Sequence, residues 1–111
     1  MTEIDPQAEF AGGNEALAEG RAEDAVAHYR KALAGAPDVV EIHHNLTAAL
    51  AQLQRLDDAA ESARQGLARR PDYAPLHVAL ANLLREPGQG DAIETARQHY
   101  EKALQHDPGL A

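Results

Sequence analysis

The sequence contains no cysteine and no tryptophan, and aromatic residues make up only 4% of its 111 positions. The absence of cysteine excludes disulfides, thiolate metal ligands and cysteine nucleophiles. Basic residues are also scarce, with 10 Lys and Arg against 18 Asp and Glu. The resulting net charge of −8 argues against nucleic-acid binding, which needs clustered Lys and Arg, and it permits a basic partner.

Long apolar runs are absent as well. None approaches the roughly 20 residues that a membrane-spanning helix needs, and the first residues, "MTEIDPQAEF", lack the basic end and apolar stretch of a secretory signal. We therefore expect a cytoplasmic chain with no membrane segment.

Alanine is abundant, with 24 copies, and it favours helices that approach each other closely because it has the best helix propensity and a small side chain. Three stretches resemble one another: "AVAHYRKALAGAPD", "AAESARQGLARRPD" and "ARQHYEKALQHDPG". Their prolines, Pro37, Pro71 and Pro108, are spaced by 34 and then 37 residues. A second helical pattern precedes each stretch, so the repeated unit is two helices and two turns.

The sequence thus predicts an all-α domain of three units, at residues 6–39, 40–73 and 74–109. The three extra residues of the last unit fall in the loop "REPGQGD". The six expected helices span residues 6–19, 23–35, 39–54, 57–69, 73–86 and 92–105.

Turn residues mark the ends of these helices. Asp5 before Pro6 is expected to cap the first helix, and Asp57, Asp72 and Asp91 are expected to cap the fourth, fifth and sixth. Gly20 suits the left-handed position after a helix.

This pattern resembles the tetratricopeptide repeat family. The residues that carry the resemblance are Gly13, Ala25, Tyr29, Ala32 and Pro37 in the first unit, Leu46, Ala59, Gly66 and Pro71 in the second, and Leu80, Ala81, Ala96, Tyr100, Ala103 and Pro108 in the third. The resemblance implies a right-handed α-solenoid, in which small residues lie where paired helices cross.

Three departures from the family pattern stand out. Ala63 replaces the Tyr of the other two units, so this part of the solenoid is expected to be thinner or to be filled from a neighbouring helix. Gly12 and Gly13 should make the first helix the least stable unless something packs on it. The chain ends at "DPGLA" without a further helix to cover the last unit, which suggests a fragment or self-association.

In this family the first helix of each unit lines a concave groove that binds a partner peptide or helix. Carried over by position, the resemblance predicts these groove residues: Phe10, Asn14, Leu17, Glu41, His44, Asn45, Ala48, Gln52, Val78, Asn82 and Arg85. The alternative is that they are simply solvated polar positions.

One subfamily clamps the acidic C-terminal tails of heat-shock chaperones with two asparagines and three basic residues. Asn14 and Asn45 match its asparagines, but Phe10, Pro75 and Ala79 occupy the basic positions. The sequence therefore argues against a carboxylate clamp.

Neither a metal site nor a catalytic site is expected. His43 and His77 recur with the repeat, as do His28 and His99, and none has a partner histidine at the helical spacing of a metal site. Ser62, the only serine, lies inside an expected helix rather than on a nucleophile turn. No cofactor is implied.

The sequence therefore predicts a non-enzymatic scaffold that binds a partner protein or peptide of unknown identity in the groove. Two alternatives stay open. The chain is a self-assembly module that dimerises through the uncovered last helix, or it is a regulatory segment of a larger enzyme.

Overall fold

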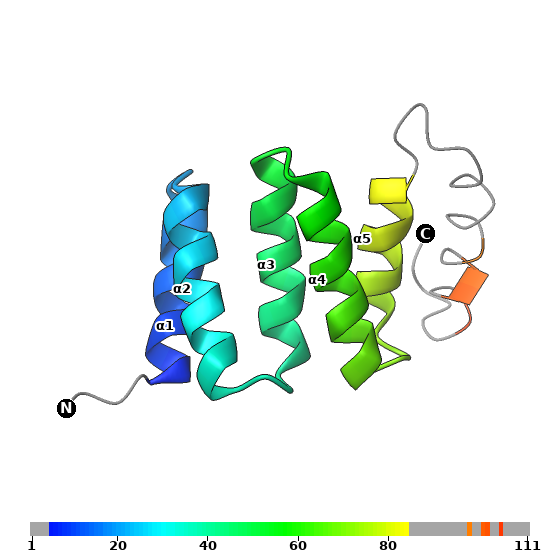
Figure 1. Cartoon of the computed structure of the whole chain (residues 1–111), viewed down its shortest axis with the longest axis horizontal. Coiled ribbons are helices and arrows are strands. Elements are labelled where there is room, and N and C mark those ends of the chain that lie inside the picture. The colour runs from blue at the N-terminus through cyan, green and yellow to red at the C-terminus, as the bar shows by residue number, and fades with distance from the viewer. Residues whose placement is uncertain (1–4, 85–97, 99–100, 103–104, 106–111) are drawn as a thin grey trace.

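A computed structural model of the chain describes residues 5–84 together with 98, 101, 102 and 105. Five helices follow one another there (Figure 1): α1 (Pro6–Ala18), α2 (Ala22–Gly35), α3 (Val40–Gln52), α4 (Leu56–Arg69) and α5 (Ala74–Leu84). No strand occurs within this part of the chain. The all-α solenoid is confirmed, and the first five expected helices match to within two residues at each end that the structure describes; the expected end of the fifth, at 86, lies outside the described residues. The sixth, at 92–105, falls largely outside the described residues.

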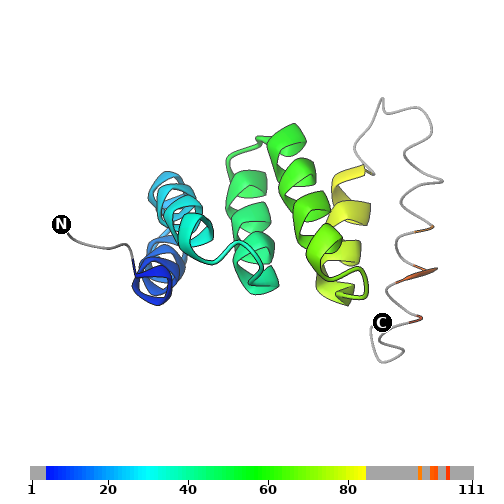
Figure 2. The ribbon, with the colours of Figure 1, turned by 60° about the horizontal axis from the view of Figure 1, so that its bottom comes forward.

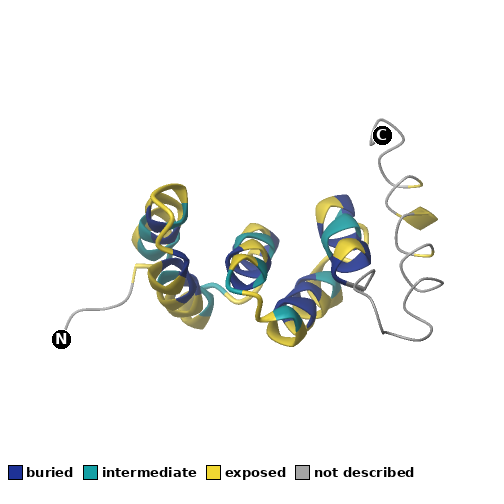
Figure 3. Cartoon of the chain, turned by 90° about the horizontal axis from the view of Figure 1, so that it is seen from above, coloured by how far each residue is buried: buried dark blue, intermediate teal, exposed yellow. Residues whose placement is uncertain are grey.

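The helices form two layers. Each helix packs against the next along the chain, and α3 also contacts both α1 and α5, whereas α2 and α4 do not contact each other. The row of helices therefore curves, with α1, α3 and α5 on its inner side (Figure 2). Buried residues lie where neighbouring helices face one another (Figure 3). Among the described helices, none has the length and hydropathy to cross a membrane.

Tyr29 fills the space between α1 and α2. Its side chain is fully buried, and a Cβ placed on Gly13 would stand only 2.5 Å from its Cε1 atom. Phe10 packs on the same ring, with 5.9 Å between the ring centroids. Gly13 is thus required because the Tyr29 ring approaches α1 closely. The same ring supplies the packing that α1 needs.

The second unit is built differently. Ala63 is fully buried, and Thr47 occupies the position equivalent to Gly13. One turn after Ala63, a Cβ placed on Gly66 would stand 2.3 Å from Cδ1 of Leu76 in α5. Leu76 of α5 therefore packs closely against α4 one turn beyond Ala63.

Helix ends agree with the sequence in part. The Asp5 carboxylate accepts a hydrogen bond from the backbone N–H of Gln7 at 3.0 Å, which confirms this N-cap. Gly20 has the expected left-handed backbone, with φ of +79°. Gln54, 34 residues later, adopts the same conformation with φ of +59°.

Two of the predicted caps are wrong. The N-cap of α4 is Arg55, without a side-chain hydrogen bond, so Asp57 lies inside the first turn and stabilises the helix only through its charge. Helix α5 begins at Ala74, one residue later than expected, so Asp72 lies too far upstream to cap it and instead faces Arg70 at 3.9 Å. Asp91 lies outside the described residues.

The recurring histidines anchor the loops between units. The Nε2 atom of buried His43 lies 2.9 Å from the carbonyl oxygen of Pro37, and Nε2 of buried His77 lies 2.7 Å from that of Pro71. Each contact fastens the loop before a unit to the first helix of that unit. This structural task explains why a histidine recurs at this position.

Candidate partner-binding groove

A cluster of hydrogen bonds joins α1 to α3 on the inner side of the solenoid. The Tyr29 hydroxyl donates to Oδ1 of Asn14 at 2.6 Å, and Nδ2 of Asn45 donates to the same oxygen at 2.8 Å. Burial raises the pKa of Tyr29. The Oδ1 atom of Asn14 therefore serves the fold, and a partner can use only the Nδ2 group of this side chain.

The inner side is hollowed between α3 and α5. A pocket of about 310 Å³ lies there, at the lower end of the ~300–1,000 Å³ typical of ligand sites. The residues that line it are His44, Thr47, Ala48, Ala51, Gln54, Leu56, Ala79, Asn82 and Leu83. Three of the predicted groove residues, His44, Ala48 and Asn82, meet in this pocket.

The other lining residues are missing from the predicted groove set. A signal for two of them exists, because Thr47 and Ala51 follow His44 at positions i+3 and i+7 and so share its helical face. Gln54 comes from the turn after α3, and Leu56 is the first residue of α4, directly after this turn. Their contribution depends on the conformation of this turn, which periodicity does not indicate.

Aromatic rings flank the pocket near the start of α5. The rings of His44 and Tyr73 meet edge to face, with 6.1 Å between their centroids. The guanidinium of Arg70 lies over the Tyr73 ring, 5.0 Å from its centroid.

These groups are partly desolvated. Burial lowers the pKa of His44, and a hydrogen bond with Asn45 partly opposes this effect. Burial raises the pKa of Tyr73, and the charge of Glu41 adds to the increase. Both side chains are therefore neutral at neutral pH, and the charges beside them are those of Glu41 and Arg70.

Besides Asn14 and Asn45, four predicted groove residues on the inner helices line neither this pocket nor another hollow. Phe10 and Leu17 are half-buried and pack against the core. Val78 on α5 is also half-buried, whereas Glu41 in the first turn of α3 is exposed. Glu41 and Val78 are therefore the members of this set that present side chains beyond the core packing.

Two predicted residues do not join the others. Gln52 lines a separate hollow of about 420 Å³ beside the turn between α1 and α2. Arg85 lies outside the described residues. Of the three positions that are basic in a carboxylate clamp, Phe10 packs on Tyr29, Pro75 is exposed in the first turn of α5, and Ala79 lines the pocket.

Similar proteins share this architecture. The chain is 38% identical over 98 residues to the Hsp70-Hsp90 organizing protein of Triticum aestivum, covering 88% of this chain and 16% of that protein. A solved structure of MamA (MSR-1, C2) has a TM-score of 0.81 at 25% identity, over 97% of this chain and 60% of that one. The first TPR of Spaghetti (RPAP3), bound to the HSP90 peptide SRMEEVD, has a TM-score of 0.83 at 19% identity, over 97% and 86% of the two chains.

The chain thus spans about a sixth of the length of the wheat protein. The likeness to the Spaghetti domain, at 19% identity, concerns the fold alone. The family profile described as "Tetratricopeptide repeat" matches residues 16–83, which is more than half of the chain. The chain therefore belongs to the tetratricopeptide repeat family.

Proposed function

We propose that the chain is a non-enzymatic interaction scaffold that binds a peptide or helix of a partner protein along α1, α3 and α5. Repeats of this family are generally interaction modules. The observation that carries the proposal is the pocket between α3 and α5, where small side chains line the hollow beside the polar groups of His44 and Asn82. Such a site seats one apolar side chain and orients the chain around it.

A chaperone-tail clamp is not part of this proposal. Its basic positions hold Phe10, Pro75 and Ala79, so the carboxylates of an acidic terminus would lose their water without gaining a counter-charge. Asn14 and Asn45 match the clamp, but they bond to each other and to Tyr29. Their presence is accounted for by the packing of α1 on α3.

Isothermal titration with the peptide SRMEEVD tests this exclusion. We expect a Kd weaker than about 1 mM, because no described Lys or Arg lies on the inner helices. Replacement of both Pro75 and Ala79 by basic residues supplies the matched positive control. Binding of the peptide to the unmodified chain at micromolar concentration would show that this chain is a clamp after all.

Ala48→Trp tests the groove itself. Ala48 is exposed on α3 and lines the pocket, so the indole fills the hollow without disturbing the core. Ala27→Trp on α2 is the matched control, because Ala27 is exposed on an outer helix. A partner in a lysate of the source organism should be captured by the parent and by Ala27→Trp and lost with Ala48→Trp. Capture of the same proteins by all three chains would contradict the groove as the binding site.

Self-association is the alternative to the binding of a different protein. It involves the predicted helix at 92–105, most of which lies outside the described residues. A mass in sedimentation equilibrium that rises with concentration, and that Ala48→Trp leaves unchanged, would favour self-association over the groove.

A further inference from the structure

We propose that the partner segment is cationic, with an aliphatic or aromatic side chain in the pocket between α3 and α5 and a Lys or Arg side chain beside Glu41. This inference rests on the groove function proposed above and adds the chemistry of the partner to it. The distribution of charge between the inner and outer helices carries it.

The described residues of the inner helices include carboxylates and no Lys or Arg, and the predicted groove residue Arg85 lies outside them. Within α1, α3 and α5 the charged residues are Glu9, Glu15 and Glu41. Glu9 is paired with His28 of α2, with 2.7 Å between Oε2 and Nδ1. Glu15 and Glu41 are both exposed, and Glu41 lies one turn before His44 of the pocket, so Glu41 is the carboxylate that the inner side offers to a partner.

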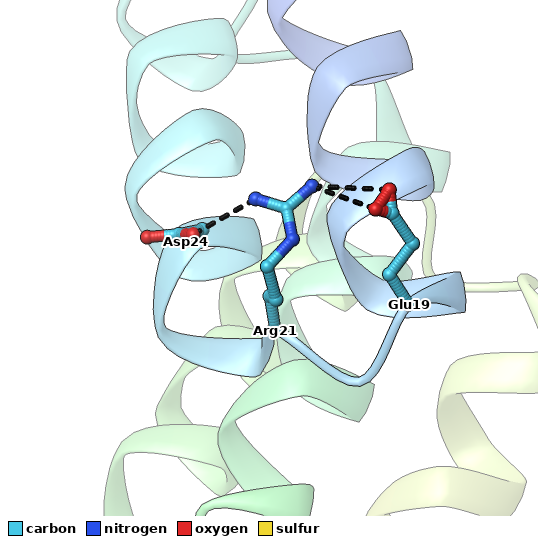
Figure 4. A network of polar contacts seen from close by, with 3 residues as sticks. All are labelled: Glu19, Arg21 and Asp24. Carbon is cyan, nitrogen blue, oxygen red and sulfur yellow. Dashed lines mark hydrogen bonds and ion pairs between the residues drawn. The ribbon is translucent and has the colours of Figure 1, made fainter.

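The cations of the described repeats lie on the outer helices and in the turns. Between residues 5 and 84 they are Arg21, Arg30, Lys31, Arg55, Arg64, Arg69 and Arg70. Arg21 shows how the turns use them: its guanidinium bonds to Glu19 at 3.1 Å and to Asp24 at 2.9 Å, bridging the end of α1 and the start of α2 (Figure 4).

Three further cations are paired in the same way. Arg55 forms an ion pair with Glu23 across two units, and Arg69 lies 3.4 Å from Asp38. Arg70 lies over the Tyr73 ring beside the pocket, with the Asp72 carboxylate 3.9 Å away. The described charge on the inner helices beside the pocket is therefore that of Glu41, and it attracts positive charge.

The spacing along α3 defines what a ligand must present. Glu41, His44, Ala48 and Ala51 follow one another on one face of the helix. At 1.5 Å per residue, the seven residues from Glu41 to Ala48 span about 10 Å, which equals about three residues of extended chain. An extended ligand thus needs its basic residue about three positions from its apolar residue.

His44 separates the two subsites. His44 lies between Glu41 and Ala48 in the sequence. Its ring contacts Tyr73, and the residue lines the pocket. Because the imidazole is neutral at neutral pH, the pocket wall does not repel a cationic segment. Acidification would place a positive charge between the two subsites and weaken the binding of that segment.

A display selection tests the inference with the chain of 111 residues as bait. The probe is a library of random 12-residue peptides held internally in a carrier protein, so that no binder depends on a free carboxyl terminus. We expect enrichment of Lys or Arg three positions from Leu, Ile or Phe, and depletion of Asp and Glu. The enriched peptides are then synthesised, and their Kd is measured by fluorescence anisotropy.

Three variants separate the possible results. Glu41→Lys should raise the Kd of the cationic peptides at least tenfold, and Ala48→Trp should abolish their binding. Glu61→Lys on the outer helix α4 makes the same change in net charge at an exposed position and should alter the Kd less than twofold. Circular dichroism confirms that each variant is folded.

Each alternative result overturns a different statement. The selection could instead enrich acidic peptides that no longer bind Ala48→Trp and that bind Glu41→Lys more tightly. This result would refute the cationic partner and leave the groove function standing. Equal weakening by Glu41→Lys and Glu61→Lys would refute the subsite at Glu41. Failure to find any peptide that Ala48→Trp weakens would refute the groove function together with the inference.

Discussion

Gly13→Ala tests the packing that defines the first unit. The new methyl group favours the helix by about 1 kcal/mol, but it would stand 2.5 Å from Cε1 and 2.7 Å from Cδ1 of Tyr29. Tyr29 has no room to move, because its side chain is fully buried and its hydroxyl is held by Asn14. Overpacking of such a site costs about 1–3 kcal/mol. With the cost at the upper end of that range, we expect a net loss of about 1–2 kcal/mol.

The assay is urea unfolding followed by circular dichroism, with thermal unfolding as a second measure. Each kcal/mol lost lowers the Tm by roughly 4–8 °C in a domain of about this length. Gly12→Ala is the matched control, because its methyl group would meet the ring of half-exposed His28 at 3.1 Å, and that ring can shift outward. The control should be at least as stable as the parent, and by up to about 1 kcal/mol more stable, because the helix gains the propensity of Ala.

The decisive comparison is made in a chain that carries Tyr29→Ala. This change alone costs about 3–5 kcal/mol, so all four chains of the cycle are compared in trimethylamine N-oxide, which strengthens effective burial. Without the ring, Gly13→Ala should become stabilising by about 1 kcal/mol, which reverses its sign. The same effect of Gly13→Ala in both backgrounds would refute the close approach of Tyr29 to α1.

Other predictions concern turns, crossings and protonation. Gly20→Ala should lower the free energy of unfolding by about 1 kcal/mol, and Gln54→Gly should raise it by about 0.5–1 kcal/mol, because both positions have positive φ; equal signs in urea unfolding would contradict this. Ala59→Leu, at a fully buried position, should cost about 1–3 kcal/mol, and an unchanged Tm would show that the repeat register is wrong. The folded-state pKa of His44 lies below its ordinary 6.5, so the unfolded chain binds more protons as the pH falls from 6.5 to the folded-state value, and stability decreases over that window. An NMR titration of His44 should show its midpoint below 6.5, and a midpoint at or above 6.5 would be inconsistent with the burial of its ring.

The helices and their order are predictable from the sequence because their signals are local. The proline spacing gives the unit length, and alanine at the crossings favours close helix pairs. The helical period then indicates which residues share the inner face, and His44, Ala48 and Asn82 do meet in one pocket. These statements need only the geometry of a single helix and the repetition of one unit.

What the sequence does not predict depends on contacts between residues far apart in the sequence and on the conformation of a turn. The side-chain oxygen of Asn14 accepts hydrogen bonds from Tyr29 and Asn45, which lie 15 and 31 residues away in the sequence. The start of α4 depends on the left-handed conformation of Gln54, a residue type that rarely marks such a turn. Capping by Asp57 fails for this reason, since a one-residue shift of the helix start moves the side chain into the first turn.

The residues that hold the solenoid together and those that face a partner are largely separate sets. Ala25, Ala32 and Ala59 are fully buried at the crossings, whereas Glu41 and Ala48 are exposed on the inner side. Substitutions at Glu41 and Ala48 should therefore change which partner binds without lowering stability by more than about 0.5 kcal/mol.

Asn14 is the exception to this separation, because its carbonyl satisfies the buried hydroxyl of Tyr29. Asn14→Ala should cost about 1–3 kcal/mol of stability, since a buried donor loses its acceptor. Asn14→Asp keeps an acceptor at this position and should recover most of that loss. A variant of Asn14 that loses partner binding therefore identifies the groove only if its unfolding curve is measured beside its affinity, whereas Ala48→Trp carries no such ambiguity.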